Sequence, residues 1–94
     1  MARLVIFGTG DIARLAHFYF SRDSEHEVVA FTVDAEYRKG ESFLDLPLVD
    51  TASVTTAYPP EQHAMFVAMS YAGMNRVRAA KYEQMKSAGY RLVS

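Results

Sequence analysis

The residues best suited to chemistry lie in a glycine-rich segment near the start of the chain. Residues 8–13 read Gly-Thr-Gly-Asp-Ile-Ala, which matches the pattern G-x-G-x-x-A. In this pattern the first glycine permits a tight turn, the second lets a phosphate approach the backbone, and the alanine lets a helix pack closely on a sheet. The start of the following helix offers free N–H groups to an anion. The segment therefore predicts an anion-binding turn at Gly8 and Gly10, with a tightly packed turn that binds no ligand as the alternative.

A carboxylate follows the second apolar segment of the chain. Asp34 lies 26 residues beyond Gly8 and directly after a stretch rich in β-branched side chains. In dinucleotide-binding folds an acidic residue at this place accepts hydrogen bonds from ribose hydroxyls. It would repel a 2′-phosphate, so NAD or a nucleoside diphosphate is favoured over NADP. The alternative is an ordinary polar residue at a strand end.

A third candidate group lies near the end of the chain. Asn75, Arg78 and Tyr82 fall within about 60° of one another on a helical wheel. Arginine and asparagine early in a helix can meet a phosphate or the edge of a base. The alternative is a solvated helix face on which Arg78 pairs with an acidic neighbour.

The sequence contains no complete set of catalytic residues. His17, His26 and His63 are scattered and show no metal-ligand spacing, and Ser70 does not lie in a G-x-S-x-G motif. We therefore predict no metal site, no catalytic residues and no reaction carried out by this segment alone.

The elements that must position these residues alternate between strand and helix. Continuous apolar runs predict strands that are buried on both faces, and apolar residues at helical spacing predict helices. Strands are expected at residues 4–7, 28–33, 64–70 and 90–93, and helices at residues 11–21, 51–57 and 74–88. Residues 46–49 are expected to form a short edge strand, because edge strands tolerate Pro47. In the last helix Lys81 and Gln84 interrupt the apolar arc. The order predicts an α/β domain with a mostly parallel sheet.

Composition and charge limit the possible classes of protein. The chain has 94 residues, a net charge of -1 and no cysteine, which fits one small globular domain and excludes disulfides, thiolate metal sites and cysteine catalysis. No apolar run approaches the ~20 residues of a membrane span. Residues 1–75 hold five basic and ten acidic side chains, a balance of -5, whereas residues 76–94 hold five and one, a balance of +4. The basic segment is too small and too poor in aromatic residues for a nucleic-acid surface. We expect a cytoplasmic protein that binds neither nucleic acid nor a membrane.

Taken in order, these motifs resemble a known family. The likeness rests on residues 6–13, on Val33-Asp34, on the apolar run at 64–70, and on Asn75, Arg78 and Tyr82 at their observed spacing. Together they resemble the N-terminal domain of bacterial sugar O-acyltransferases, a group that includes sialic-acid O-acetyltransferase-like proteins and N-acetyltransferases of nucleotide-linked amino sugars. The resemblance covers essentially the whole chain.

The resemblance implies a small three-layer Rossmann-like domain with helices on both faces, which binds a nucleotide-sugar for a sugar acetyltransferase. It assigns Gly8, Thr9 and Gly10 to the phosphate or ribose side, Asp34 to the nucleoside, and Asn75 and Arg78 to the flanks of the same crevice. It also implies that residues 1–94 are a fragment lacking a C-terminal left-handed β-helix of hexapeptide repeats. That missing domain would bind acetyl-CoA, supply the catalytic histidine and form a homotrimer.

One departure from the family pattern keeps two other functions open. Many members have a Gly-His pair after the second glycine of the motif, where this chain has Asp11-Ile12. The first alternative is an NAD-type dinucleotide-binding module of an oxidoreductase. The second is a ligand-free structural or interaction domain.

Overall fold

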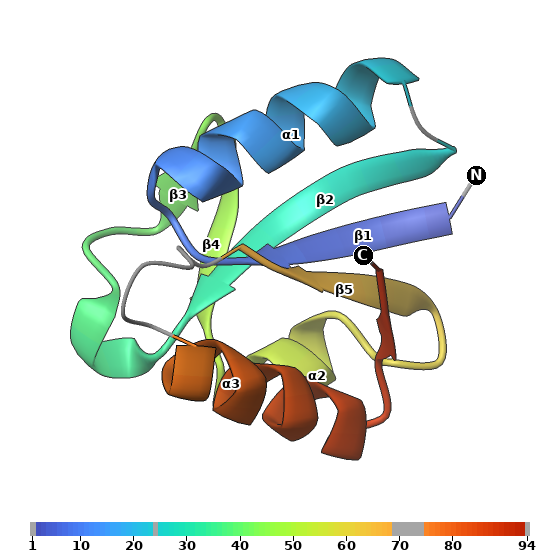
Figure 1. The fold of residues 1–94 in the computed structure, drawn as a ribbon. Helices are drawn as coiled ribbons and strands as arrows, with labels where there is room; N and C mark the ends of the chain where they lie inside the picture. Colours follow the sequence, from blue (N-terminus) through green and yellow to red (C-terminus); the bar gives the residue numbers. More distant parts are fainter. Residues whose placement is uncertain (1, 24, 69–74, 94) are drawn as a thin grey trace.

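A six-stranded sheet with helices on both faces forms the body of the protein in a computed structural model, which describes residues 2–23, 25–68 and 75–93 (Figure 1). The elements in chain order are β1 (Ala2–Phe7), α1 (Asp11–Asp23), β2 (His26–Val33), the short 3-10 helix η1 (Ala35–Tyr37), β3 (Ser42–Phe43), β4 (Leu46–Asp50), α2 (Val54–Ala57), β5 (His63–Val67), α3 (Asn75–Ser87) and β6 (Arg91–Leu92).

Strand β1 forms the centre of the molecule because its side chains are apolar on both faces. Leu4 and Ile6 belong to the core cluster beneath α1, whereas Val5 and Phe7 belong to the cluster on the opposite face. All four are buried. Alternation of side chains across a strand requires such a continuous apolar run when both faces are covered. The predicted buried strand is therefore confirmed.

The sheet has the order β3-β4-β2-β1-β5-β6. All its pairs are parallel except β3 with β4. Successive strands run outward from β1 on one side as β2 and β4, and then on the other side as β5 and β6. The predicted mostly parallel α/β architecture is confirmed, and the direction of the strand order reverses between β1 and β5.

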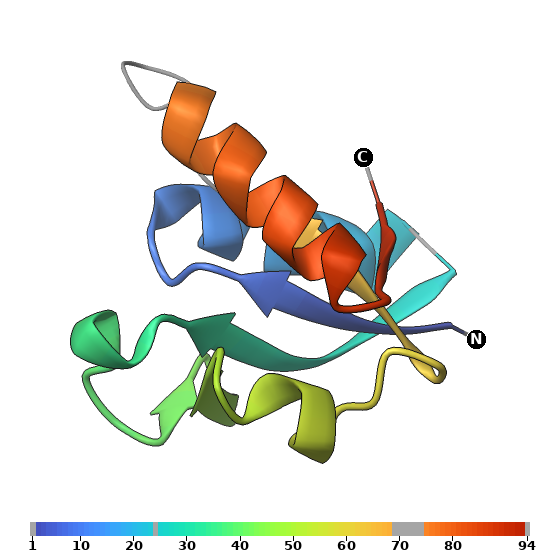
Figure 2. The same ribbon diagram turned by 90° about the horizontal axis from the view of Figure 1, so that it is seen from below.

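Helices cover the two faces of this sheet, so the fold has three layers. Helix α1 packs through Ala13, Ala16 and Phe20 on one face. Helices α2 and α3 cover the other face, where Val54 and Met85 join one apolar cluster (Figure 2). None of the described helices is long and apolar enough to cross a lipid bilayer.

The predicted strand at residues 46–49 is confirmed as β4, but its predicted place at the edge of the sheet was wrong. Strand β3 pairs outside β4, with Ser42 opposite Pro47 and Phe43 opposite Leu46. The two-residue turn between them places Leu44 at φ 51° and Asp45 at φ 63°. Positive φ at both central residues is the geometry that matches the twist of a hairpin, but Asn-Gly is its usual sequence. The hairpin was missed because this sequence lacks that signal.

Candidate functional site

The predicted site residues come from one edge of the sheet, where the parallel strands β1, β2 and β5 have their carboxyl ends. Gly8 follows β1, Asp34 follows β2, and Asn75 begins the helix that follows β5 (Figure 1). The reversal of strand order between β1 and β5 lies at the same edge. Open α/β sheets bind ligands in the crevice at such a reversal. Sequence and topology therefore point to the same part of the molecule.

Gly8 holds the ends of β1 and β5 close together. Its φ is +121°, and its N–H donates to the carbonyl oxygen of Thr32 at 2.9 Å. A Cβ at this position would lie 2.7 Å from the carbonyl oxygen of Ala68, directly after β5. The Ala68 N–H in turn donates to Phe7 O at 2.9 Å. Close backbone packing alone therefore accounts for the glycine at position 8.

Gly10 lies in a more open place at the start of α1. A Cβ added there meets no described atom within 4 Å, and its carbonyl accepts a hydrogen bond from Arg14 N at 3.1 Å. Within residues 2–23, 25–68 and 75–93, no hydrogen-bond partner is found for the N–H groups of Thr9 and Gly10. The first N–H groups of any helix also lack intrahelical partners. The turn can thus present several amide hydrogens to an anion.

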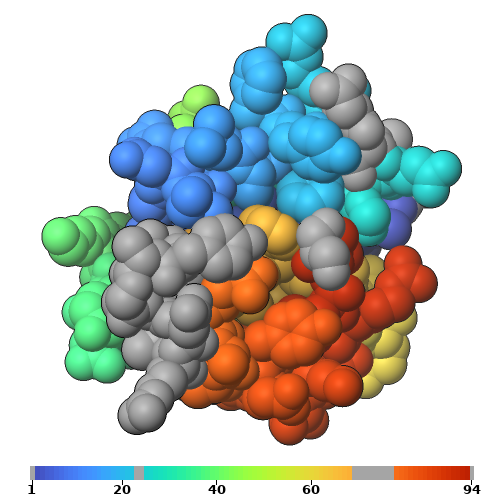
Figure 3. Space-filling model, in the orientation of Figure 1, coloured from blue at the N-terminus to red at the C-terminus, as the bar shows by residue number. Residues whose placement is uncertain are grey.

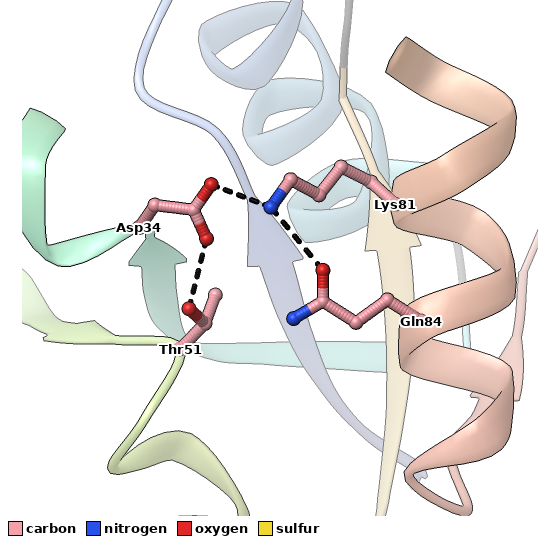
Figure 4. A network of polar contacts seen from close by, with 4 residues as sticks. All are labelled: Asp34, Thr51, Lys81 and Gln84. Atoms are coloured by element: carbon pink, nitrogen blue, oxygen red, sulfur yellow. Dashed lines mark hydrogen bonds and ion pairs between the residues drawn. The ribbon is translucent and has the colours of Figure 1, made fainter. Parts of the chain in front are cut away.

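Asp34 is the centre of a polar network that joins three elements (Figure 4). Thr51 Oγ1, just after β4, donates to Asp34 Oδ1 at 2.9 Å. Lys81 Nζ, from α3, lies 2.5 Å from Asp34 Oδ2 and also donates to Gln84 Oε1 at 3.2 Å. The Lys81 ammonium lies 5.5 Å from the ring centroid of Phe7, within cation–π range. The carboxylate therefore links the end of β2 to helix α3.

The environment of Asp34 keeps its carboxylate ionised. Burial raises its pKa, but the hydrogen bonds from Lys81 and Thr51 and the charge of Lys81 together outweigh burial, so that the pKa is lowered. A carboxylate has about four lone-pair sites, and the described contacts occupy two of them. Asp34 thus keeps acceptor capacity for a hydroxyl group.

Lys81 was not among the predicted site residues, although the sequence held a signal for it. Lys81 and Gln84 interrupt the apolar arc of α3, and in the structure Lys81 is partly buried whereas Gln84 is exposed. A polar residue on a buried face usually has a polar partner. Asp34, with opposite charge at a predicted strand end, was the natural candidate for that partner.

We expect the Asp34–Lys81 pair to contribute measurable stability near neutral pH. Asp34→Asn and Lys81→Met should each lower the free energy of unfolding by about 1 kcal/mol, with a coupling energy of roughly 0.5–1 kcal/mol in a double-mutant cycle. Because the pKa of Asp34 is lowered on folding, this contribution is present above the ordinary aspartate value of 3.8 and is lost as the pH falls through the lower folded value. Urea unfolding at pH 7 and pH 3 measures both. A coupling energy of zero at pH 7 would contradict the pairing.

The remaining predicted residues lie on α3. Asn75 is its first residue, and its side chain lies outside the described part of the structure. Arg78 is partly buried one turn before Lys81. Residues i and i+3 share a helix face, so Arg78 and Lys81 place two cations on the same side of α3, near the carboxyl edge. The structure thus brings Gly8, Thr9, Gly10, Asp34 and Arg78 to one edge of the sheet, and whether they bind a ligand stays a prediction.

Histidines and acidic residues do not assemble into a metal site within the described ranges, where no group of three possible ligands is found. The ring of His17 lies 5.9 Å from that of Phe31. His63 is buried, and its Nδ1 lies 2.9 Å from Pro59 O at the amino end of β5. His63 thus makes a local contact away from the carboxyl edge, and His17 packs against Phe31 of the core beneath α1.

One cavity lies at the carboxyl ends of the parallel strands, and a larger one lies at their amino ends. The first, a shallow cavity of about 360 Å³, lies beside Asp34 at the ends of β2 and β4 and is lined by Ala35, Arg38, Gly40, Glu41 and Asp50. The second, of about 560 Å³, lies at the opposite, amino edge and includes Arg3, His63 and Arg91. Because α/β sheets bind ligands at their carboxyl edge, we place the candidate site at the former edge despite the larger cavity at the latter.

Comparison with known proteins supports the fold. Neither the protein-family models nor the curated proteins give a match to this sequence. Among solved structures, the acetyltransferase domain of PglB from Neisseria gonorrhoeae FA1090 in complex with acetyl coenzyme A superposes with a TM-score of 0.69 at 20% identity, over 94% of this chain and 40% of that one. The chain shares its fold with part of this acetyltransferase domain. A second structure of the PglB domain gives a TM-score of 0.70 at 20% identity, over 96% and 42%. The chain thus spans about two fifths of the length of these domains.

Proposed function

We propose that residues 1–94 bind a nucleotide-sugar and form the N-terminal, substrate-binding domain of a sugar acetyltransferase. The observation that carries the proposal is the open turn at Thr9 and Gly10, whose amide hydrogens have no described partner, at the reversal of strand order. The fold that the chain shares with the PglB acetyltransferase domain supports the same class. Acetyl transfer, acetyl-CoA binding and trimer formation would belong to a longer protein.

Each group at the carboxyl edge has a chemical role in this proposal. A diphosphate would accept hydrogen bonds from the amides of Thr9 and Gly10, which the start of α1 reinforces through its dipole. Arg78 would supply a charge-assisted contact to the same phosphates. Asp34 would accept a ribose hydroxyl on its remaining lone pairs, with Lys81 keeping it ionised. In this proposal none of these groups acts on the acetyl group.

Isothermal titration calorimetry with UDP- and dTDP-sugars tests the proposal. We expect saturable binding to the wild-type chain and no binding of NAD. Gly10→Ala should weaken binding at least about tenfold, because the methyl group would occupy the space that the phosphate needs. An absence of heat at millimolar nucleotide-sugar would contradict the proposal, and saturable binding of NAD instead would favour a dinucleotide module.

A matched pair of arginine variants locates the ligand. Arg78→Gln removes one charge near the carboxyl edge, and we expect a loss of about tenfold or more in affinity, as for a charge-assisted hydrogen bond. Arg91→Gln removes one charge beside the cavity at the amino edge and should change affinity less than about twofold, since a distant surface charge is screened. The opposite ranking would move the site to the amino edge.

A further inference from the structure

Helix α1 carries a row of exposed side chains that the described part of the chain does not cover. Leu15, Phe18 and Tyr19 are 66%, 59% and 57% exposed. Asp11, Leu15, Phe18 and Arg22 follow one another at intervals of four, three and four residues and are all exposed. Side chains at these intervals lie on one face of a helix. We call this row the α1 stripe, and Figure 3 shows its helix in blue on the surface of the molecule.

Two copies of the α1 stripe that run in opposite directions match each other in charge and in apolar side chains. From the amino end it presents an acid, two large apolar residues and a base. The positions are symmetric about the point midway between Leu15 and Phe18, so that a reversed copy places Leu15 opposite Phe18 and Asp11 opposite Arg22. Intervals of four and three residues also give the 3.5-residue period at which two helices keep one seam in contact.

We infer that α1 pairs in antiparallel orientation with α1 of a second copy of this chain. Leu15 and Phe18 of each copy would bury those of the other copy, and each Asp11 would meet the Arg22 of the second copy. A two-fold axis requires this kind of self-complementary surface. The Arg22 guanidinium already lies along the stripe, 5.0 Å from the ring centroid of Phe18. The pairing does not depend on the proposed nucleotide-sugar site.

An open apolar groove beside the α1 stripe fits the same arrangement. It measures about 280 Å³ and is lined by Ile12, Leu15, Ala16, Tyr19, Phe20 and Phe66. In the reversed copy Tyr19 comes next to Ile12, at the mouth of this groove, so that its ring can enter it. The charged ends favour a second copy over an anionic lipid surface. The acid and the base give the stripe no net positive charge, which attraction to anionic lipid would need.

Charge exchange tests the pairing directly. Analytical ultracentrifugation of the wild-type chain should show a dimer at high micromolar concentration. Asp11→Lys and Arg22→Glu should each give a monomer, because like charges then meet at both ends. The double variant should dimerise again, and an equal mixture of the two single variants should form a heterodimer. Circular dichroism of each variant checks that α1 is retained.

Several outcomes would overturn the inference. A wild-type monomer at every concentration, with or without binding to anionic vesicles, excludes the pairing. So does a double variant that stays monomeric, or a dimer in which Asp11→Lys changes nothing. Leu15→Gln provides a second route that leaves both charges in place. Because Leu15 is 66% exposed, this variant should fold normally but lose the dimer.

Discussion

Replacing Gly8 by alanine should destabilise the protein more than any other change of one methyl group at the candidate site. The residue has φ +121°, a conformation that side-chain-bearing residues rarely adopt, and the new Cβ would lie 2.7 Å from Ala68 O. The contact is with backbone, so rotation of a side chain cannot relieve it. Conformational strain and overpacking together predict a loss of about 3 kcal/mol in the free energy of unfolding.

Gly10→Ala is the matched control, since it adds the same methyl group two residues away. Position 10 has no positive φ and no described neighbour within 4 Å of a Cβ. We expect its stability to stay within about 1 kcal/mol of the wild type, because a weaker helix cap is offset by a less flexible unfolded chain. Urea unfolding of both variants at one pH measures the difference. Equal midpoints would mean that the ends of β1 and β5 are not held together at Gly8.

This contrast refines what the glycine motif predicts. From the sequence, both glycines serve a ligand site, one through a turn and one through close approach. In the structure Gly8 is required by the fold itself, because it makes room for Ala68 O. Only Gly10 lies where the fold places no demand on it. A motif of this kind therefore predicts the strand-turn-helix geometry more securely than it predicts a ligand.

The architecture could be predicted because its signals are local. A continuous apolar run such as residues 4–7 is needed for a strand covered on both faces, and helical spacing marks α1. The hairpin at Leu44 and Asp45 could not be predicted, since its turn places a leucine at positive φ, which a bulky residue rarely adopts. Leu44 is partly buried against the core beneath α1, and this packing offsets the strain.

Long-range pairing is the part of the site that spacing does not reveal. Asp34 and Lys81 are 47 residues apart and come together only because α3 lies across the sheet from the end of β2. From the sequence, Asp34 is correctly expected at a strand end, and Lys81 is expected as a charged residue that interrupts the apolar face of a helix. Joining the two observations requires the strand order, which in turn depends on the reversal between β1 and β5.

The hydroxyl of Tyr90 joins the end of α3 to α2, so its removal should destabilise the protein. The residue is buried, and its hydroxyl shares its one proton between two carbonyl oxygens, Tyr58 O at 2.6 Å and Val54 O at 3.1 Å. Tyr90→Phe removes this donor. Val54 O keeps the hydrogen bond from Tyr58 N at 2.7 Å, whereas the partly buried Tyr58 O loses the donor described for it. We expect the free energy of unfolding to fall by about 1–2 kcal/mol, as for a partly buried acceptor that loses its partner.

Tyr37→Phe is the matched control for this change, since it removes the same atom from a side chain that is 64% exposed. We expect it to alter stability by less than about 0.5 kcal/mol, as for an ordinary surface substitution. Guanidinium unfolding at pH 7 compares the two variants. If they lose the same amount, the Tyr90 hydroxyl does not hold α2 to the end of α3.

The same hydroxyl should make stability depend on alkaline pH. Burial, and to a lesser extent the charge of Glu61, raises the pKa of Tyr90 from 10.0 to about 12. Because the folded pKa lies above the unfolded one, the stabilisation is complete below pH 10 and is lost as the pH rises toward 12. Unfolding curves between pH 8 and pH 11 should therefore show a decline in the wild type that is smaller in Tyr90→Phe. An identical decline in both would assign the alkaline transition to other groups and leave Tyr90 without a role in it.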